Sequence, residues 1–258
     1  MGSSDLPYSG RLTHFFIRPE QIVDDVINFD RDDAHHMYVV LRMRPGQACI
    51  ALDNTGRAMY VEIDKLSRTE ATGCILRIDQ PNTEAQTRIT IAQALPNTFD
   101  KLEWVLQHAT EIGTFRFIVF SCQRARENWD RFVRKSPRWA QIVKSAAEQS
   151  GRTRLPEVTG IPTFGDLLAT VGSYDAVIMA YEGERDLLLS HALAVNAHDI
   201  LLIVGPEGGF SSEEVLSAKG AGVATVSLGP RILRTETAAL VMAAQTLFAL
   251  EGHCSAVT

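Results

Sequence analysis

Several common signatures of metal, disulfide and membrane proteins are absent from this 258-residue sequence. Its four cysteines are widely spaced and form no Cys-x-x-Cys pair, which argues against a disulfide framework and favours reduced thiols in a cytoplasm. The seven histidines show no His-Glu-x-x-His or comparable spacing, so we expect no metal. No apolar run approaches ~18 residues, so we expect no transmembrane helix, and no secretory signal is visible.

Positive charge is concentrated in one segment of an acidic chain. The formal net charge is −6, yet residues 116–154 hold ten basic and three acidic residues. Such a segment indicates one anionic partner at one place, and two tryptophans, Trp129 and Trp139, lie within it. The alternative, a solvated helix face with no partner, stays open.

The first third of the sequence has the pattern of a small β-barrel. Residues 1–10 are polar and read as a flexible leader. After them, short strands separated by turn residues are expected at 14–17, 47–53, 58–63 and 72–78. One helix is expected at 33–42, with its cap at Asp32 or Asp33. Several strands closing on one helix predict a barrel over residues 11–80, followed by a linker at 80–86.

From residue 87 onward, strands and helices alternate. Strands are expected at 88–95, 115–120, 176–180, 200–204 and 223–227, and helices at 100–113, 137–150, 211–219 and 237–250. The third of these helices opens on a capping box, Ser211-x-x-Glu214. This alternation predicts a mostly parallel sheet covered on both faces. The last helix is apolar on nearly every side, which favours burial against a partner subunit.

Two loops near the C-terminus carry the strongest functional signal. Residues 205–210 (Gly-Pro-Glu-Gly-Gly-Phe) and 228–238 (Leu-Gly-Pro-Arg-Ile-Leu-Arg-Thr-Glu-Thr-Ala) each follow a buried-type strand. Ligands of α/β sheets bind at this end of the strands, but neither loop is Gly-x-Gly-x-x-Gly or a P-loop. The glycines let a neutral or zwitterionic ligand lie against main-chain groups, as the adenine or methionine part of S-adenosylmethionine would.

This pair of loops resembles the cofactor loops of SPOUT RNA methyltransferases, and most closely those of the RsmE family, which methylates N3 of a uridine in 16S ribosomal RNA. Further matching motifs are Ala180-Tyr181-Glu182, residues 100–103, 109–113 and 146–152, and His35-His36 with residues 40–42 and Gly46. The resemblance covers nearly the whole chain from residue 11. It departs at Asn97-Thr98 and at His108, where the family usually carries basic residues.

The resemblance implies a PUA-like β-barrel RNA-binding domain at 11–80 and a trefoil-knotted SPOUT α/β methyltransferase domain at 87–258. It also implies an obligate homodimer and, as the partner, 16S ribosomal RNA within the small ribosomal subunit, although naked RNA stays open as the substrate. S-adenosylmethionine is the implied cofactor. The implied cofactor-binding residues are Ala180, Tyr181, Glu182, Gly205, Pro206, Glu207, Gly208, Gly209, Leu228, Gly229, Ile232, Leu233 and Thr237.

Three residues are candidates for the chemical step. Arg234 and Arg231 are expected to stabilise the anion that forms when N3 loses its proton, although arginine is equally suited to bind phosphate. Glu236 is a candidate base, or a carboxylate stabilised by the helix dipole. The implied RNA-binding residues are Arg11, Arg18, Arg42, Arg124, Arg126, Gln149 and Arg152.

Two other functions stay open at this point. One is a SPOUT enzyme that methylates a different RNA atom, such as a ribose 2′-OH. The other is a non-catalytic RNA-binding protein in which the barrel and the basic segment bind RNA and the two loops are only turns.

Overall fold

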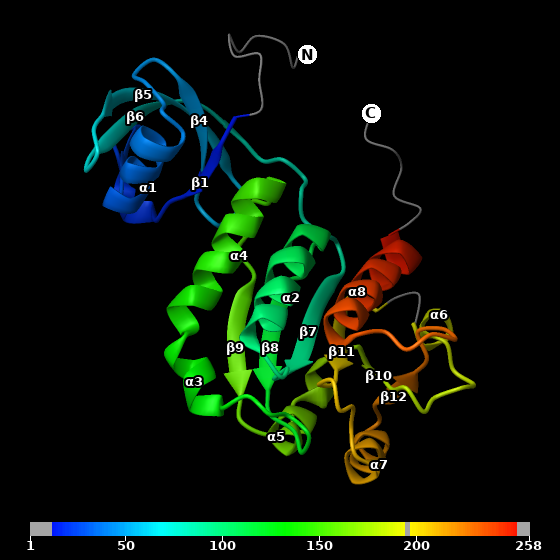
Figure 1. The fold of residues 1–258 in the computed structure, drawn as a ribbon. Coiled ribbons are helices and arrows are strands. Elements are labelled where there is room, and N and C mark those ends of the chain that lie inside the picture. The colour runs from blue at the N-terminus through cyan, green and yellow to red at the C-terminus, as the bar shows by residue number, and fades with distance from the viewer. Residues whose placement is uncertain (1–11, 194–196, 252–258) are drawn as a thin grey trace. The chain divides into compact units, whose positions relative to one another are not determined.

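The computed structural model describes residues 12–193 and 197–251, and the chain divides into two compact units (Figure 1). Unit 1 comprises Met1–Glu84 and Ala147–Leu155, and unit 2 comprises Ala85–Ala146 and Pro156–Thr258. The expected domain at 87–258 includes residues 147–155, whereas the contacts group Ala147–Leu155 with the N-terminal unit. The domain boundaries themselves stay a prediction.

Unit 1 contains a six-stranded sheet with the order β1-β4-β5-β6-β3-β2. Strand β1 pairs parallel to β4, and the other pairs are antiparallel. Closure of this sheet into a barrel stays a prediction. The strands are β1 (His14–Phe16), β2 (Ile22–Val23), β3 (Val26–Phe29), β4 (Ala48–Leu52), β5 (Ala58–Leu66) and β6 (Ala71–Asp79), with a 3-10 turn at Pro19–Gln21. The short strands β2 and β3 had no expected counterpart.

The helix of unit 1 begins earlier than expected. Helix α1 (Arg31–His35) is capped by Asp30, whose carboxylate accepts hydrogen bonds from the main-chain N–H groups of Asp32 and Asp33 at 3.1 and 2.9 Å. The expected caps, Asp32 and Asp33, are therefore already in the first turn. The helix continues as a π-helical turn, His36–Val40, and Arg42 leaves it with a φ of +53°.

Unit 2 contains a six-stranded sheet, with the order β12-β10-β11-β7-β8-β9, in which every pair of neighbouring strands is parallel. Its strands are β7 (Arg88–Ala94), β8 (Arg116–Phe120), β9 (Glu157–Ile161), β10 (Ala176–Ala180), β11 (Asp199–Val204) and β12 (Ala224–Val226). Its helices are α2 (Phe99–Ile112), α3 (Trp129–Arg134), α4 (Ser136–Ser150), α5 (Phe164–Leu168), α6 (Leu189–Ala192), α7 (Ser212–Gly220) and α8 (Thr235–Glu251), with a 3-10 turn at Val171–Ser173. Helix α4 starts in unit 2 and ends in unit 1.

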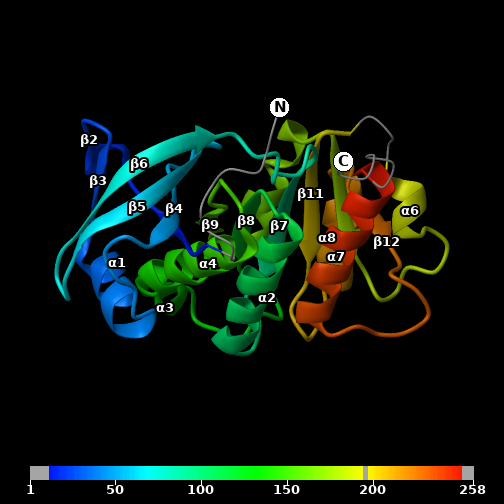
Figure 2. The same cartoon turned by 90° about the horizontal axis from the view of Figure 1, so that it is seen from above.

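Both faces of this parallel sheet are covered, as the continuous apolar strands predicted. On β11, Ile200 and Leu202 belong to the apolar cluster that includes residues of α2, α4 and α8. The alternate residues, Leu201 and Ile203, belong to the cluster that includes residues of α5 and α7. Figure 2 shows α2 and α8 side by side on the first of these faces. Because all six strands are parallel, their carboxyl ends and the loops that follow them lie at the same edge of the sheet.

Four elements of unit 2 had no expected counterpart: β9, α3, α5 and α6. Strand β9 is a half-exposed edge strand with Gly160 one residue before its end. The three helices span at most six residues each, so none has a clear periodic pattern. Among residues 12–193 and 197–251, no helix is long and apolar enough to cross a membrane.

Candidate functional site

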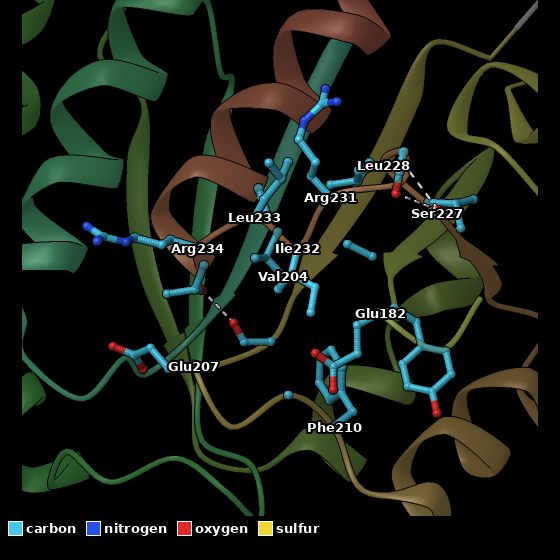
Figure 3. Close-up of a pocket in the computed structure, with 18 of the residues that line it drawn as sticks. Glu182, Val204, Glu207, Phe210, Ser227, Leu228, Arg231, Ile232, Leu233 and Arg234 are labelled. Carbon is cyan, nitrogen blue, oxygen red and sulfur yellow. Dashed lines mark hydrogen bonds between the residues drawn. The ribbon is translucent and has the colours of Figure 1, made fainter. Parts of the chain in front are cut away.

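A cavity of about 320 Å³ lies at the carboxyl ends of the adjacent strands β10, β11 and β12 (Figure 3). Because the three strands are parallel and neighbours, the three loops that follow them meet at one place. Val204, Ile232 and Leu233 lie on one side of the cavity, and Glu182 and Phe210 lie opposite them. The lining is completed by Ala180, Tyr181, Arg185, Gly205, Pro206, Glu207, Gly209, Val226, Ser227, Leu228, Gly229, Pro230, Arg231, Arg234, Thr235 and Ala238.

The loop after β11 is a tight turn that brings its glycines close to neighbouring side chains. Gly209 has a φ of +66°, which favours glycine, and its N–H donates to the carbonyl of Pro206 at 2.9 Å. A β-carbon at Gly205 would lie 2.9 Å from the ring of Phe210. That ring packs against Phe164, with 5.3 Å between centroids. The loop therefore exposes main-chain groups to the cavity, and the ring of Phe210, which also lines the cavity, packs between Gly205 and Phe164.

The carboxylate in this loop, Glu207, is held by two partners from α2 and the segment before it. It accepts hydrogen bonds from the main-chain N–H of Asn97 at 2.9 Å and from the ammonium of Lys101. Burial alone would raise the pKa of Glu207, but these hydrogen bonds and the charge of Lys101 hold that pKa below its usual range. Glu207 is therefore ionised and paired at neutral pH.

The loop after β10 is fastened to β12 by Glu184. Its carboxylate accepts hydrogen bonds from the hydroxyl of Thr225 at 2.8 Å and from the main-chain N–H groups of Arg185 and Asp186 at 3.0 and 3.1 Å. The bond from Thr225 is the largest cause that lowers the pKa of Glu184, to about 2. This carboxylate therefore stays charged at neutral pH and holds the adjacent Arg185 in the cavity wall.

The loop after β12 carries cations and an exposed apolar side chain. Arg231 and Arg234 are exposed and have no ion-pair partner within the described residues. Figure 3 shows Arg234 on the same side of the cavity as Glu207, whereas Arg231 extends from its other end. Ile232, between them, is 86% exposed. Two unpaired guanidinium groups at the cavity rim suit an anionic ligand.

A buried hydrogen-bond relay joins two of the three loops. The amide of Gln93, which is 1% exposed on β7, donates to the hydroxyl of Thr235 at 2.9 Å. That hydroxyl donates in turn to the carbonyl of Gly205 at 2.6 Å. A hydroxyl has only one proton to donate. Because the Thr235 hydroxyl donates that proton to Gly205, it can only accept the hydrogen bond from Gln93. The relay fixes the start of α8 against the glycine loop, and sequence reasoning had assigned no role to either side chain.

The structure brings together most of the residues for which the resemblance implied a role in cofactor binding or catalysis. Eleven of the thirteen implied cofactor-binding residues line the cavity, as do the candidate catalytic residues Arg231 and Arg234. Gly208 does not, because a side chain there would point at Arg124, with a β-carbon 3.2 Å from that of Arg124. The assigned cofactor role of each residue stays a prediction.

Helix geometry explains why Thr237 and Glu236 do not line the cavity. Thr235 and Ala238 do, and they are three residues apart on α8. Thr237 is rotated by about 200° from Thr235, and Glu236 by about 100°. The Oε2 atom of Glu236 is buried and has no hydrogen-bond partner within the described residues. Its position therefore favours the helix-dipole role over that of a base at the cavity.

The implied RNA-binding residues fall into both units. Arg18 and Arg42 are exposed in unit 1, and Arg124 and Arg126 are exposed in unit 2. Gln149 is exposed within Ala147–Leu155, which belongs to unit 1. Arg11 lies outside the described residues.

Arg152 differs from the exposed surface contact that was expected. It is 5% exposed, and its guanidinium is ion-paired with Glu84 at 2.6 Å. The same carboxylate accepts from the main-chain N–H groups of Thr153 and Arg154 at 3.0 and 3.2 Å. The ion pair of Arg152 with Glu84 therefore anchors Ala147–Leu155 within unit 1. A contact between Arg152 and RNA would require breaking this buried ion pair. Within the described ranges, no group of three histidine, cysteine, aspartate or glutamate residues is arranged to hold a metal ion.

Comparison with known proteins places this chain among RNA methyltransferases. A family model of the RNA methyltransferase domain matches residues 83–247, and one of the RNA methyltransferase PUA domain matches residues 29–73. The ribosomal RNA small subunit methyltransferase E of Bacillus subtilis is 35% identical over 217 residues, which cover 81% of this chain and 84% of that protein.

Two solved structures with bound S-adenosylmethionine have the same fold. A ribosomal RNA small subunit methyltransferase E from Neisseria gonorrhoeae has a TM-score of 0.81 and 29% identity, covering 91% of this chain and 96% of that one. A methyltransferase from Legionella pneumophila has a TM-score of 0.84 and 26% identity, covering 93% and 98%. The chain belongs to the ribosomal RNA small subunit methyltransferase E (RsmE) family, which confirms the resemblance seen in the two loops.

Proposed function

We propose that this protein transfers the methyl group of S-adenosylmethionine to N3 of a uridine in 16S ribosomal RNA, in the cytoplasm. The observation that carries the proposal is the cavity at the ends of β10, β11 and β12, with walls that combine main-chain groups of glycine turns with apolar side chains. Such walls suit the adenine and the methionine part of S-adenosylmethionine, and relatives with this fold were solved with S-adenosylmethionine bound.

In the proposed reaction, N3 forms a bond to the methyl carbon while the carbon–sulfur bond breaks, and the electron pair of that bond passes to sulfur. The products are N3-methyluridine, S-adenosylhomocysteine and the N3 proton, which passes to water. This chain supplies orientation, which can account for ~7–11 kcal/mol of such a barrier. It also supplies positive charge near the uracil oxygens, on which negative charge develops, and Arg234 is our candidate for that role.

Two measurements test this function against the alternatives. Calorimetry with S-adenosylmethionine separates a methyltransferase from a non-catalytic RNA-binding protein, which would show no binding heat. Mass spectrometry of nucleosides from treated RNA then identifies the acceptor atom. We expect N3-methyluridine, and a 2′-O-methylated nucleoside would show that the enzyme methylates ribose instead.

Family membership also supports the finer architecture that the resemblance implies. We propose that the chain of unit 2 forms a trefoil knot around the cofactor site and that the sheet of unit 1 closes into a PUA-like barrel. A crystal structure with S-adenosylmethionine, traced continuously through residues 205–210 and 228–235, tests the knot. A chain that passes those loops without threading would contradict it.

We predict that Thr235→Val weakens cofactor binding by about tenfold without unfolding the protein. Valine has nearly the shape of threonine but has no hydroxyl, so it leaves the buried amide of Gln93 and the carbonyl of Gly205 without their partner. The loop and the start of α8 then lose their mutual restraint. Calorimetry with S-adenosylmethionine measures the effect, and Thr235→Ser should restore most of the affinity.

Thr246→Val is the matched control for this prediction. Thr246 lies on the same helix and is 0% exposed, and its hydroxyl has no hydrogen-bond partner within the described residues. Its replacement should leave cofactor affinity unchanged. Equal effects of the two valine variants would show that the relay has no special role.

We also propose that the protein is a homodimer through α8. Phe248 is 79% exposed on this helix, and Trp104, on the adjacent helix α2, is 43% exposed. Leu240 and Leu247, on the same helix, are partly buried and pack against the core of unit 2. Exposed aromatic side chains on neighbouring helices suit a protein interface.

Sedimentation equilibrium should therefore give about twice the monomer mass of 28.4 kDa. Phe248→Asp should shift the equilibrium toward monomer, because a carboxylate would replace an apolar contact at the interface centre. Glu213→Gln, on the exposed start of α7, is a control that should leave the dimer intact. A monomeric parent protein at micromolar concentration would refute the dimer.

A further inference from the structure

A second cavity of about 410 Å³ adjoins the first one in unit 2. It lies where the chain leaves β7 and β8, and the glycine loop after β11 forms its remaining wall. Its volume falls within the range of ligand sites, ~300–1,000 Å³. Glu207 lines both cavities, so the glycine loop is their shared wall. The lining comprises Asn97, Gln123, Arg124, Ala125, Arg126, Glu207 and Gly208.

The cations at this cavity differ from the other arginines of the basic segment 116–154. Most of the other arginines in the segment have partners that satisfy their charge or their donors. The ion pairs are Arg116–Glu157, Arg131–Glu127, Arg138–Glu103 and Arg152–Glu84, and Arg154 donates to the carbonyl of Thr55. Arg124 and Arg126, by contrast, are exposed and have no carboxylate partner within the described part of the chain.

Arg124 is held in place by the glycine loop. Its Nη1 donates to the carbonyl of Gly208 at 2.8 Å. A β-carbon at residue 208 would lie only 3.2 Å from the β-carbon of Arg124, so glycine permits this close approach. A guanidinium has five N–H donors in a rigid plane, and this bond uses one of them. The remaining donors can serve a ligand that carries oxygen acceptors.

The other polar groups of the cavity leave it with a net positive charge. The carboxylate of Glu207 is already paired with Lys101, so it does not neutralise Arg124 and Arg126. The side chains of Asn97 and Gln123 are exposed and offer both donors and acceptors. Two arginines with two amides match a phosphate next to a base that has carbonyl oxygens and a ring N–H.

We propose that this second cavity receives the acceptor nucleotide of the RNA, a single pyrimidine nucleotide flipped out of its stack. The proposal rests on the proposed methyltransferase function and adds the place of the acceptor. Arg124 and the amides face the base, and Arg126 binds the phosphate. Methyl transfer then takes place where the cavities meet, at Glu207, on the side of the first cavity where Arg234 lies (Figure 3).

The test compares two arginines of the same basic segment. Arg126→Gln removes an unpaired cation at the cavity, and Arg138→Gln removes one that is paired with Glu103. We expect Arg126→Gln to raise the KM for RNA about tenfold and to lower the slope of log K against log salt concentration by about one. Arg138→Gln should change neither by more than about twofold, and both variants should bind S-adenosylmethionine like the parent protein.

A cross-link to the acceptor position gives an independent readout. RNA with 4-thiouridine at the methylated position, bound to the full chain with S-adenosylhomocysteine, should cross-link on irradiation to peptides that contain Asn97 or Gln123. Equal behaviour of the two arginine variants, or cross-links confined to other peptides, would overturn the proposal. Absence of any methylated product would instead refute the methyltransferase function, so the two failures are distinguishable.

Discussion

Arg234→Ala is expected to lower the single-turnover rate of methylation by about 10²–10³, because a preorganised cation next to the developing anion is lost. Arg234 lines the cavity, is exposed, and has no ion-pair partner within the described residues. It therefore meets a ligand without first breaking an existing bond. The rate is measured at saturating RNA and S-adenosylmethionine, so that weaker binding of either one does not contribute.

Arg234→Lys separates charge from geometry in this experiment. Lysine keeps the positive charge but not the planar fork, so it should retain more activity than alanine if charge is the important property. Arg138→Gln, which removes an arginine outside both cavities, should leave the saturated rate unchanged. If Arg234→Ala raises the Kd for RNA and leaves the saturated rate intact, Arg234 binds phosphate and has no part in the chemical step.

Gly205→Val should weaken S-adenosylmethionine binding by about 10- to 100-fold, because an inserted side chain in a packed site costs about 1–3 kcal/mol and about 1.4 kcal/mol is tenfold in Kd. The new β-carbon would lie 2.9 Å from the ring of Phe210, closer than side-chain packing allows. The ring cannot move away freely, since it is 6% exposed and packs against Phe164. The glycine loop must therefore shift, and this loop forms a wall of the cavity.

Gly172→Val is the matched control, because a β-carbon there would meet no atom within 4 Å. It should bind S-adenosylmethionine like the parent protein. Circular dichroism and thermal melting show whether Gly205→Val is folded, and Thr235→Val tests the same loop with a smaller perturbation. Parental affinity in a folded Gly205→Val protein would contradict the site assignment.

Much of unit 2 was predictable from the sequence because its strands are short, continuous apolar runs. Strand β10 (Ala176–Ala180) has the expected bounds. Strand β11 begins one residue earlier than expected, and helix α7 begins and ends one residue later than expected. The capping box at Ser211 and Glu214 is present, since it depends on residues three apart in the chain. Elements without periodicity, such as β9 and α3, were missed because neighbouring residues give no signal for edge strands and single helical turns.

The sequence by itself determined the family, the parallel sheet and the two loops that meet at the cavity, because these depend on local residue patterns. Only the tertiary structure decided which side chains serve the site. It turned Gly208 toward Arg124, joined Gln93 through Thr235 to Gly205, and buried Arg152 against Glu84. Each of these contacts joins residues between 30 and 142 positions apart in the chain, and only packing brings such residues together.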